Sequence, residues 1–251
     1  MNWAGKIMRN IINKIRAIFG LKPQRYYGHI ISLGHNCEAS FQFFKKYHFS
    51  ESSLFAWCAC ANINTLINAI NNLDMVGTGN FKPVNRMWQC QNTKIFFHGK
   101  GKQKEWKNNP SQEFFDNDLK ELKSRLAHLR QKFIETGKDG KKNLYIYKCS
   151  TNEERLPQET LVSHIYHLYE TIREKCSNPF DLLIVLEKDI LTDIEQVSDN
   201  PHIFIRRVDF FTDPEHVASA PSDTHGWNRI FSEFRPDFKL PKRKRYKFED
   251  E

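Results

Sequence analysis

The sequence predicts an α/β fold in which a mostly parallel sheet carries helices on both faces of a single domain. Three observations support this prediction. Short apolar segments alternate with amphipathic segments along most of the chain, as is typical of parallel strands joined by helices. The 251 residues, 39% of them hydrophobic, are enough to bury the core of one such domain. Only 11 glycines and 10 prolines are present, which excludes fibrous and low-complexity architectures.

The N-terminal segment predicts a basic amphipathic helix over 1–19, within a separate element that we place at 1–22. Its apolar positions recur at helical spacing, and they are Trp3, Ile7, Ile11, Ile15 and Ile18. The basic residues lie mostly off that stripe, and they are Lys6, Arg9, Lys14 and Arg16. Gly20 and Pro23 then end the helix. Such a helix can lie on an anionic membrane surface or pack on its own domain, and both interpretations stay open.

The α/β domain is expected to span 23–238. We expect strands at 27–33, 94–98, 143–149, 180–186 and 202–208. We expect helices at 37–47, 63–73, 116–136, 158–176 and 225–234. The remaining residues, 239–251, form a tail whose basic part, 242–247, is either a solvated end or a second contact with an anionic membrane.

Charge and cysteine content restrict the class of protein. The net charge of +8 favours anionic partners, yet the basic residues form no aromatic-interleaved motif of the kind that binds nucleic acid. No stretch has the ~18 apolar residues that a membrane-spanning helix needs. The six cysteines lack the spacing of a disulfide framework or a zinc site, and no secretory signal precedes them. We therefore expect a cytoplasmic protein without a bound metal, peripheral to the inner face of the membrane if the helix at 1–19 binds lipid.

The most informative segment joins the first strand to the first helix of the domain through Gly34, His35, Asn36 and Cys37. In an open α/β sheet, ligands bind beyond the carboxyl ends of the strands, where this turn lies. Cys37 would begin the helix, and the positive end of a helix favours a thiolate and stabilises an oxyanion. The sequence therefore predicts Cys37 as a nucleophile, with the other three residues binding substrate. The alternative is a buried structural cysteine.

A cysteine nucleophile needs a base and a group that orients the base. His98 ends the second predicted strand, and it reaches the same sheet edge if that strand is parallel to the first; Gly99 then leaves room for substrate. Asp223 is the candidate orienting group, although it is also a plausible helix N-cap. His225 competes with His98 as the base, and Trp227 either packs in the core or forms a pocket wall.

Four segments in this order resemble a bacterial and viral family of papain-like cysteine peptidases. The run Ile-Ser-Leu-Gly-His-Asn-Cys-Glu-Ala-Ser at 31–40 resembles the family's opening motif, which is the specific one. The segment 54–57 is similar to its next block, but Ala56 lacks the polar side chain found there and receives no catalytic role. The segments 96–99 and 223–234 are similar to its histidine block and to its late Asp-Gly-Trp block.

The resemblance implies a Cys-His-Asp enzyme in which Cys37, His98 and Asp223 act together, while His225 is peculiar to this chain. The segment around Cys37 also resembles the Gly-Asn-Cys-Gln motif of capsular-polysaccharide acetyltransferase-like proteins, which bind coenzyme A. The implied fold is a flavodoxin-like or SGNH-like three-layer sandwich.

These observations predict cysteine-dependent acyl transfer or hydrolysis on an anionic small molecule or glycan, in the modification of surface polysaccharide or lipid-linked glycan. No resident cofactor is required, although coenzyme A or a nucleotide-linked donor would suit the chemistry. Two alternatives stay open. The protein is a cysteine peptidase, or it is a binding module in which the turn at 34–37 holds a phosphate-bearing ligand without covalent chemistry.

Overall fold

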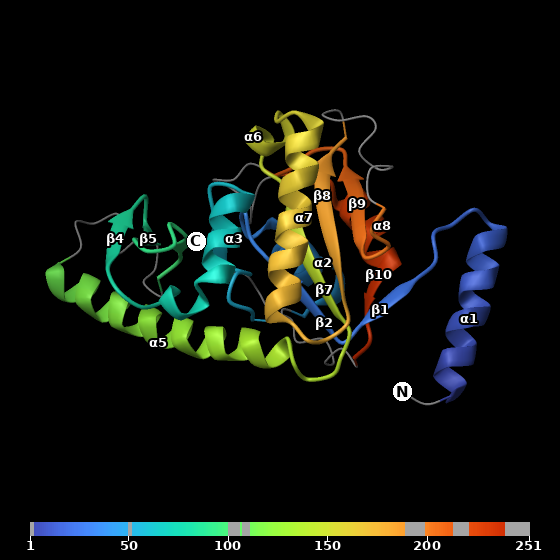
Figure 1. The fold of residues 1–251 in the computed structure, drawn as a ribbon, viewed down its shortest axis with the longest axis horizontal. Helices are drawn as coiled ribbons and strands as arrows, with labels where there is room; N and C mark the ends of the chain where they lie inside the picture. The colour runs from blue at the N-terminus through green and yellow to red at the C-terminus, as the bar shows by residue number, and fades with distance from the viewer. Residues whose placement is uncertain are drawn as a thin grey trace.

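Four parallel strands form the central sheet. The computed structural model describes residues 3–49, 52–99, 106, 111–188, 199–212 and 221–238. The strands are β2 (His29–Ser32), β7 (Asn143–Lys148), β8 (Phe180–Glu187) and β9 (Ile203–Val208), and they lie side by side in this order (Figure 1). All three pairings are parallel, so the four carboxyl ends meet at one edge of the sheet. Apolar side chains fill both faces of the middle strands, as expected of a parallel sheet covered on both sides.

Helices cover both faces of this sheet. On one face, α2 (Glu38–Tyr47) and α8 (Thr224–Glu233) pack in a core with Ile30 of β2. On the other face, α3 (Ile63–Asn71) and α7 (Gln158–Lys175) pack in a core with the next residue, Ile31. Successive side chains of a strand point to opposite faces, which explains this division. The predicted α/β sandwich with helices on both faces is confirmed.

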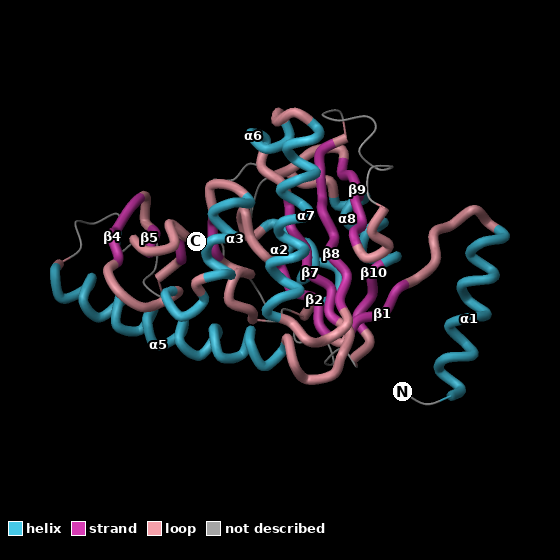
Figure 2. Tube along the Cα trace, in the orientation of Figure 1, coloured by secondary structure: helices cyan, strands magenta, loops and turns pink. Residues whose placement is uncertain are grey.

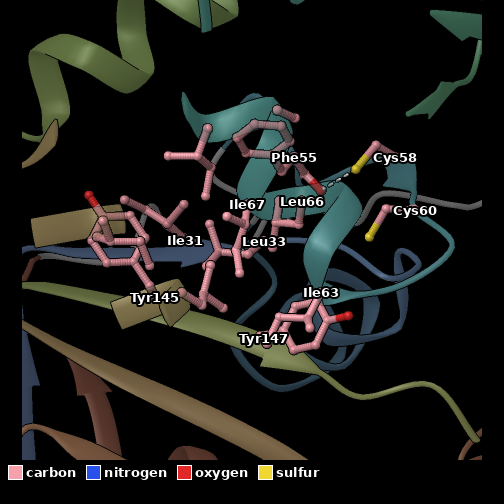
Figure 3. Close-up of a cluster of buried hydrophobic side chains, with 14 of the residues drawn as sticks. Ile31, Leu33, Phe55, Cys58, Cys60, Ile63, Leu66, Ile67, Tyr145 and Tyr147 are labelled. Carbon is pink, nitrogen blue, oxygen red and sulfur yellow. Dashed lines mark hydrogen bonds between the residues drawn. The ribbon is translucent and has the colours of Figure 1, made fainter. Parts of the chain in front are cut away.

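The core on the α3 and α7 side contains the strand residues nearest the candidate site. Figure 3 shows Ile31 and Leu33 among the side chains of Tyr145 on β7 and Leu66 on α3. Cys58 lies at the α3 side of the same cluster, where its thiol donates to the carbonyl oxygen of Phe55 at 3.2 Å. The turn that follows β2 therefore packs on a cluster of buried apolar side chains.

A second sheet is antiparallel and was only partly expected. Its strands are β4 (Phe81–Val84), β5 (Met87–Cys90), β6 (Phe96–Phe97) and β3 (Cys58–Ala59), in the spatial order β3-β6-β5-β4. The strand predicted at 94–98 is thus β6, which pairs antiparallel with β3 and β5 and does not join the parallel sheet. Asn85 and Arg86 connect β4 to β5, both with positive φ, as a tight hairpin requires. Figure 2 shows β4 and β5 at the left of the view, beside the long helix α5 (Gln112–Thr136).

The remaining elements complete the sandwich and its edge. Short helices occur at η1 (Leu73–Met75) and α6 (Thr151–Glu154). The strand predicted at 27–33 is interrupted at Gly28: β1 (Arg25–Tyr27) pairs in parallel with β10 (Phe234–Pro236), whereas β2 belongs to the central sheet. The helix α1 (Trp3–Ile18) precedes them. None of the described helices combines the length and the apolar composition that crossing a bilayer requires. The predicted tail at 239–251 lies outside the described residues.

Candidate active site at the carboxyl edge of the parallel sheet

The turn between β2 and α2 places Cys37 at the carboxyl edge of the sheet. Gly34 adopts φ +94°, and a Cβ there would lie 2.9 Å from the sulfur of Cys58, so a larger residue would force the turn open. His35 also has a positive φ of 57°. These two residues reverse the chain sharply enough for Cys37 to become the N-cap of α2. The strand-turn-helix arrangement predicted around Cys37 is therefore present.

Cys37 differs from the other cysteines in its exposure. It is partly exposed, whereas the other five are buried, and all six are free. Its side chain makes no capping hydrogen bond to the helix. However, burial raises the pKa of the Cys37 thiol to about 11, which outweighs the opposing influence of its own backbone amide and of Lys148. The expectation that the helix end would favour the thiolate is wrong for the free protein, because desolvation is the larger effect.

A buried ion pair that the sequence analysis missed fixes the start of α2. Glu38 is fully buried, and its Oε2 lies 2.9 Å from Nζ of Lys148, which ends β7 and is 2% exposed. The same carboxylate accepts hydrogen bonds at 3.2 Å from Nε1 of Trp227 and from the amide and hydroxyl of Thr212. The ammonium group also lies 4.2 Å above the ring of Phe211. Trp227 is therefore a core residue that binds Glu38, which favours the packing interpretation over a pocket wall.

The backbone of Cys60 holds His35 in a defined orientation. Its Nδ1 lies 3.1 Å from the carbonyl oxygen of Cys60, which can only accept, so Nδ1 carries the proton and Nε2 is the basic nitrogen. Burial, followed by the charge of Lys148, lowers the pKa of His35, which keeps the ring neutral near pH 7. The charge of Lys148 lowers the pKa of both His35 and Cys37, and the charge of Glu38 opposes it at both groups.

Asn36 supplies an unused donor to the same turn. Its side chain is 7% exposed, and its Oδ1 accepts from the backbone amide of Glu38 at 3.0 Å. Its Nδ2 is buried and has no hydrogen-bond partner among the described residues. A buried donor without a partner is costly, and such groups occur where a ligand or a reacting atom completes the hydrogen bond.

His98 lies at the end of β6, in the second sheet. Its backbone carbonyl accepts from the guanidinium group of Arg125, and burial, followed by the charge of Arg125, lowers the pKa of the imidazole. We expected His98 to share an edge with Cys37 if its strand ran parallel to β2. Instead, β6 pairs antiparallel with β3 and β5, so this condition is not met. Gly99 does not leave open space either, because a Cβ there would lie 1.9 Å from Oδ2 of Asp118. Its small size permits packing against that carboxylate.

Asp223 is the N-cap of α8. Its Oδ1 accepts from the amide of Gly226 at 2.8 Å and its Oδ2 from the amide of Asp209 at 2.7 Å. Within the described residues, no hydrogen bond joins Asp223 to an imidazole, and none joins an imidazole to Cys37. His225 is exposed on the first turn of α8. The structure therefore brings together residues 34–38 and Lys148, but it does not connect Asp223 to a histidine.

Glu154 is a further buried carboxyl group at the same sheet edge. Glu154 on α6 is 1% exposed; its Oε1 accepts from the amide of Glu187 at 2.6 Å, and its Oε2 has no partner among the described residues. Burial raises its pKa to about 7, against the ordinary value of 4.5, and the hydrogen bond from the amide of Glu187 and then the charge of Lys148 oppose this. This edge thus holds a carboxyl group that exchanges its proton near neutral pH.

Comparison of the chain with family models, with curated proteins and with solved structures finds no match. The resemblance of 31–40 to papain-like cysteine peptidases therefore stays a prediction, and any functional proposal depends on the geometry of the sheet edge.

Proposed function

We propose that the protein is a cysteine-dependent acyl-transfer or hydrolytic enzyme with Cys37 as its nucleophile. The observation that carries the proposal is the position of this thiol. It is the one cysteine of the six that is not buried, and it caps α2 at the edge where open α/β sheets bind ligands. Its raised pKa means that the thiol has to lose its proton during attack and so requires a general base.

We assign His35 as the base in preference to His98 and His225, because it lies two residues before Cys37 in the same turn. The hydrogen bond from Nδ1 to the carbonyl of Cys60 leaves Nε2 free to take a proton. As the sulfur of Cys37 attacks the acyl carbon, the thiol proton passes to Nε2 of His35. The carbonyl oxygen becomes an oxyanion that Nδ2 of Asn36 can bind near the positive end of α2. The bond to the leaving group breaks as that group takes the proton from His35. Water or an acceptor hydroxyl then attacks the thioester and gives its proton to His35; the C–S bond breaks, and the proton returns from His35 to the sulfur of Cys37.

The substrate class follows from charge and compartment. A net charge of +8 suits an anionic or nucleotide-linked acyl donor, with coenzyme A as one example, and a glycan hydroxyl as acceptor. Six free thiols, five of them buried, suit the reducing cytoplasm. We therefore place the reaction on the cytoplasmic side, in the modification of surface polysaccharide or of lipid-linked glycan.

One observation favours a second candidate function. The unpartnered Nδ2 of Asn36 beside the N-terminus of α2 would also suit a phosphate group held without covalent chemistry. The buried carboxylate of Glu38 in the first turn of the same helix works against an anion there, although Lys148 balances its charge. The acyl-transfer proposal is therefore preferred.

A substrate panel tests the proposal. Full-length protein is incubated with p-nitrophenyl acetate, acetyl-coenzyme A with glycan acceptors, and a fluorogenic peptide, each compared with Cys37→Ala. Cys176→Ala serves as the matched control, because Cys176 is buried at the far end of α7. We expect turnover of an ester or thioester that Cys37→Ala abolishes and Cys176→Ala retains. Turnover that Cys37→Ala retains would refute the proposal, and phosphate-dependent thermal stabilisation without turnover would favour the binding module.

A further inference from the structure

The helix α1 exposes its apolar face to solvent. Large aliphatic side chains recur on this face at three- and four-residue spacing and are exposed to solvent. Their exposed fraction ranges from 38% for Ile7 to 80% for Ile18. Between them on the same stripe are Met8, Ile11 and Ile15, at 65%, 52% and 49%. A helix of a globular domain normally turns such a stripe toward its own core. Here the stripe is a contiguous apolar surface that the described chain leaves uncovered.

The polar side of α1 faces its own domain instead. Arg9 pairs with Asp237, and its guanidinium group also lies 4.1 Å from the ring centre of Tyr26. Asn13 exchanges two hydrogen bonds with the backbone of Gln24, at 2.7 and 3.2 Å. Figure 1 shows α1 standing at the edge of the molecule beside β1, opposite the side occupied by β4 and β5. The domain therefore holds the helix by its polar face and presents the apolar face outward.

The charge of this region indicates which partner covers the apolar face of α1. The first acidic residue of the whole chain is Glu38, so α1 and the segment after it carry lysines and arginines without any carboxylate. Lys14 is exposed, and by helical geometry it borders the apolar stripe. A second copy of the helix would bring two cationic surfaces together, whereas an anionic bilayer satisfies both the isoleucines and the cations. We propose that α1 docks the protein in the interface of an anionic lipid bilayer, lying parallel to the membrane plane.

The geometry also explains how docking occurs without refolding. The contacts of Arg9 and Asn13 lie on the side opposite the isoleucines, so they stay in place when the stripe enters the lipid. The catalytic proposal for Cys37 and this docking proposal are independent, because they depend on different elements.

Vesicle flotation of the full-length protein tests the docking proposal. Vesicles of neutral phosphatidylcholine are compared with vesicles in which about 30% of the lipid is anionic phosphatidylglycerol. We expect binding to the anionic vesicles that weakens as salt rises, since screening shortens the reach of the charges. Ile11→Ser with Ile15→Ser should weaken partitioning by at least about tenfold, because two half-exposed isoleucines no longer enter the lipid. Lys14→Glu should weaken binding to anionic vesicles only.

The matched controls are Met75→Ser and Phe210→Ser, which remove hydrophobic side chains that are each 43% exposed and lie outside α1. Both should bind vesicles like the unmodified protein. Unchanged binding of the double isoleucine variant would assign the contact to another segment and overturn the proposal. Sedimentation equilibrium tests whether a second copy of the protein covers the apolar face instead. If the unmodified protein forms a dimer and does not bind vesicles, and if the double isoleucine variant is a monomer, the docking proposal is overturned.

Discussion

Replacing Lys148 by methionine should destabilise the protein strongly, because it leaves the carboxylate of Glu38 buried without its counter-charge. The two charged groups are 2.9 Å apart and almost fully buried. At an effective dielectric constant near 20, such a pair attracts by about 6 kcal/mol, and desolvation offsets much of this. The hydrogen bonds from Thr212 and Trp227 remain in the variant. We therefore expect Lys148→Met to reduce the free energy of unfolding by about 3–5 kcal/mol, the range for breaking a buried pair.

The double variant Glu38→Gln with Lys148→Met is the decisive comparison. It removes both charges, and the amide oxygen can still accept from Trp227 and Thr212, so we expect it to lie within about 2 kcal/mol of the unmodified protein. Urea unfolding followed by tryptophan fluorescence gives the free energies for the cycle. If Lys148→Met cost less than about 1 kcal/mol, or if the two single costs simply added in the double variant, the buried-pair argument would be wrong.

Three further predictions concern the titratable groups at and near the sheet edge. Asp223→Asn loses one of the two hydrogen bonds from backbone amides, so it should lower the free energy of urea unfolding by about 1–2 kcal/mol and leave kcat/KM within about twofold. A tenfold loss of kcat/KM would support the predicted role of Asp223 in a catalytic triad. The pKa of Glu154 is raised in the folded protein, so its stabilising contribution is full below pH 4.5 and is lost as pH rises through about 7. Relative to Glu154→Gln, the unfolding free energy should therefore fall by about 2.5 kcal/mol between pH 5 and 8, and parallel pH profiles would contradict this. His35→Gln should lower kcat/KM for acyl transfer to Cys37 by about 10²- to 10⁴-fold and His98→Gln by less than about threefold, and the reverse order would make His98 the base.

The parallel sheet could be predicted because its strands are continuous apolar runs that helices separate. The run at 180–186 became β8, and its composition alone indicates burial on both faces. The antiparallel sheet could not be predicted in the same way. Its hairpin turns at Asn85 and Arg86 without a glycine, and β4 contains Pro83, a residue type that is unusual within strands. A two-residue strand such as β6 also carries no signal about its partner strand.

The candidate site was predictable in position and not in electrostatics. The spacing from strand to turn to helix placed Cys37 at the N-terminus of α2, as the structure does. The pKa of its thiol depends on burial by elements distant in sequence, so the local helix argument gave the wrong direction. A signal for the ion pair did exist, since Lys148 is a cation that ends an otherwise apolar strand and Glu38 directly follows the cysteine. A charge at the end of a buried strand indicates a buried partner.

Trapping of an acyl-enzyme tests the central claim, that Cys37 is the nucleophile, most directly. Protein mixed with an activated ester or thioester is quenched in acid within a single turnover, and intact mass and peptide mapping then locate the acyl group. We predict one acyl group on Cys37, released by neutral hydroxylamine as a thioester should be, and absent from Cys37→Ala. Turnover without an adduct on Cys37, or an adduct that forms equally in Cys37→Ala, would contradict the account.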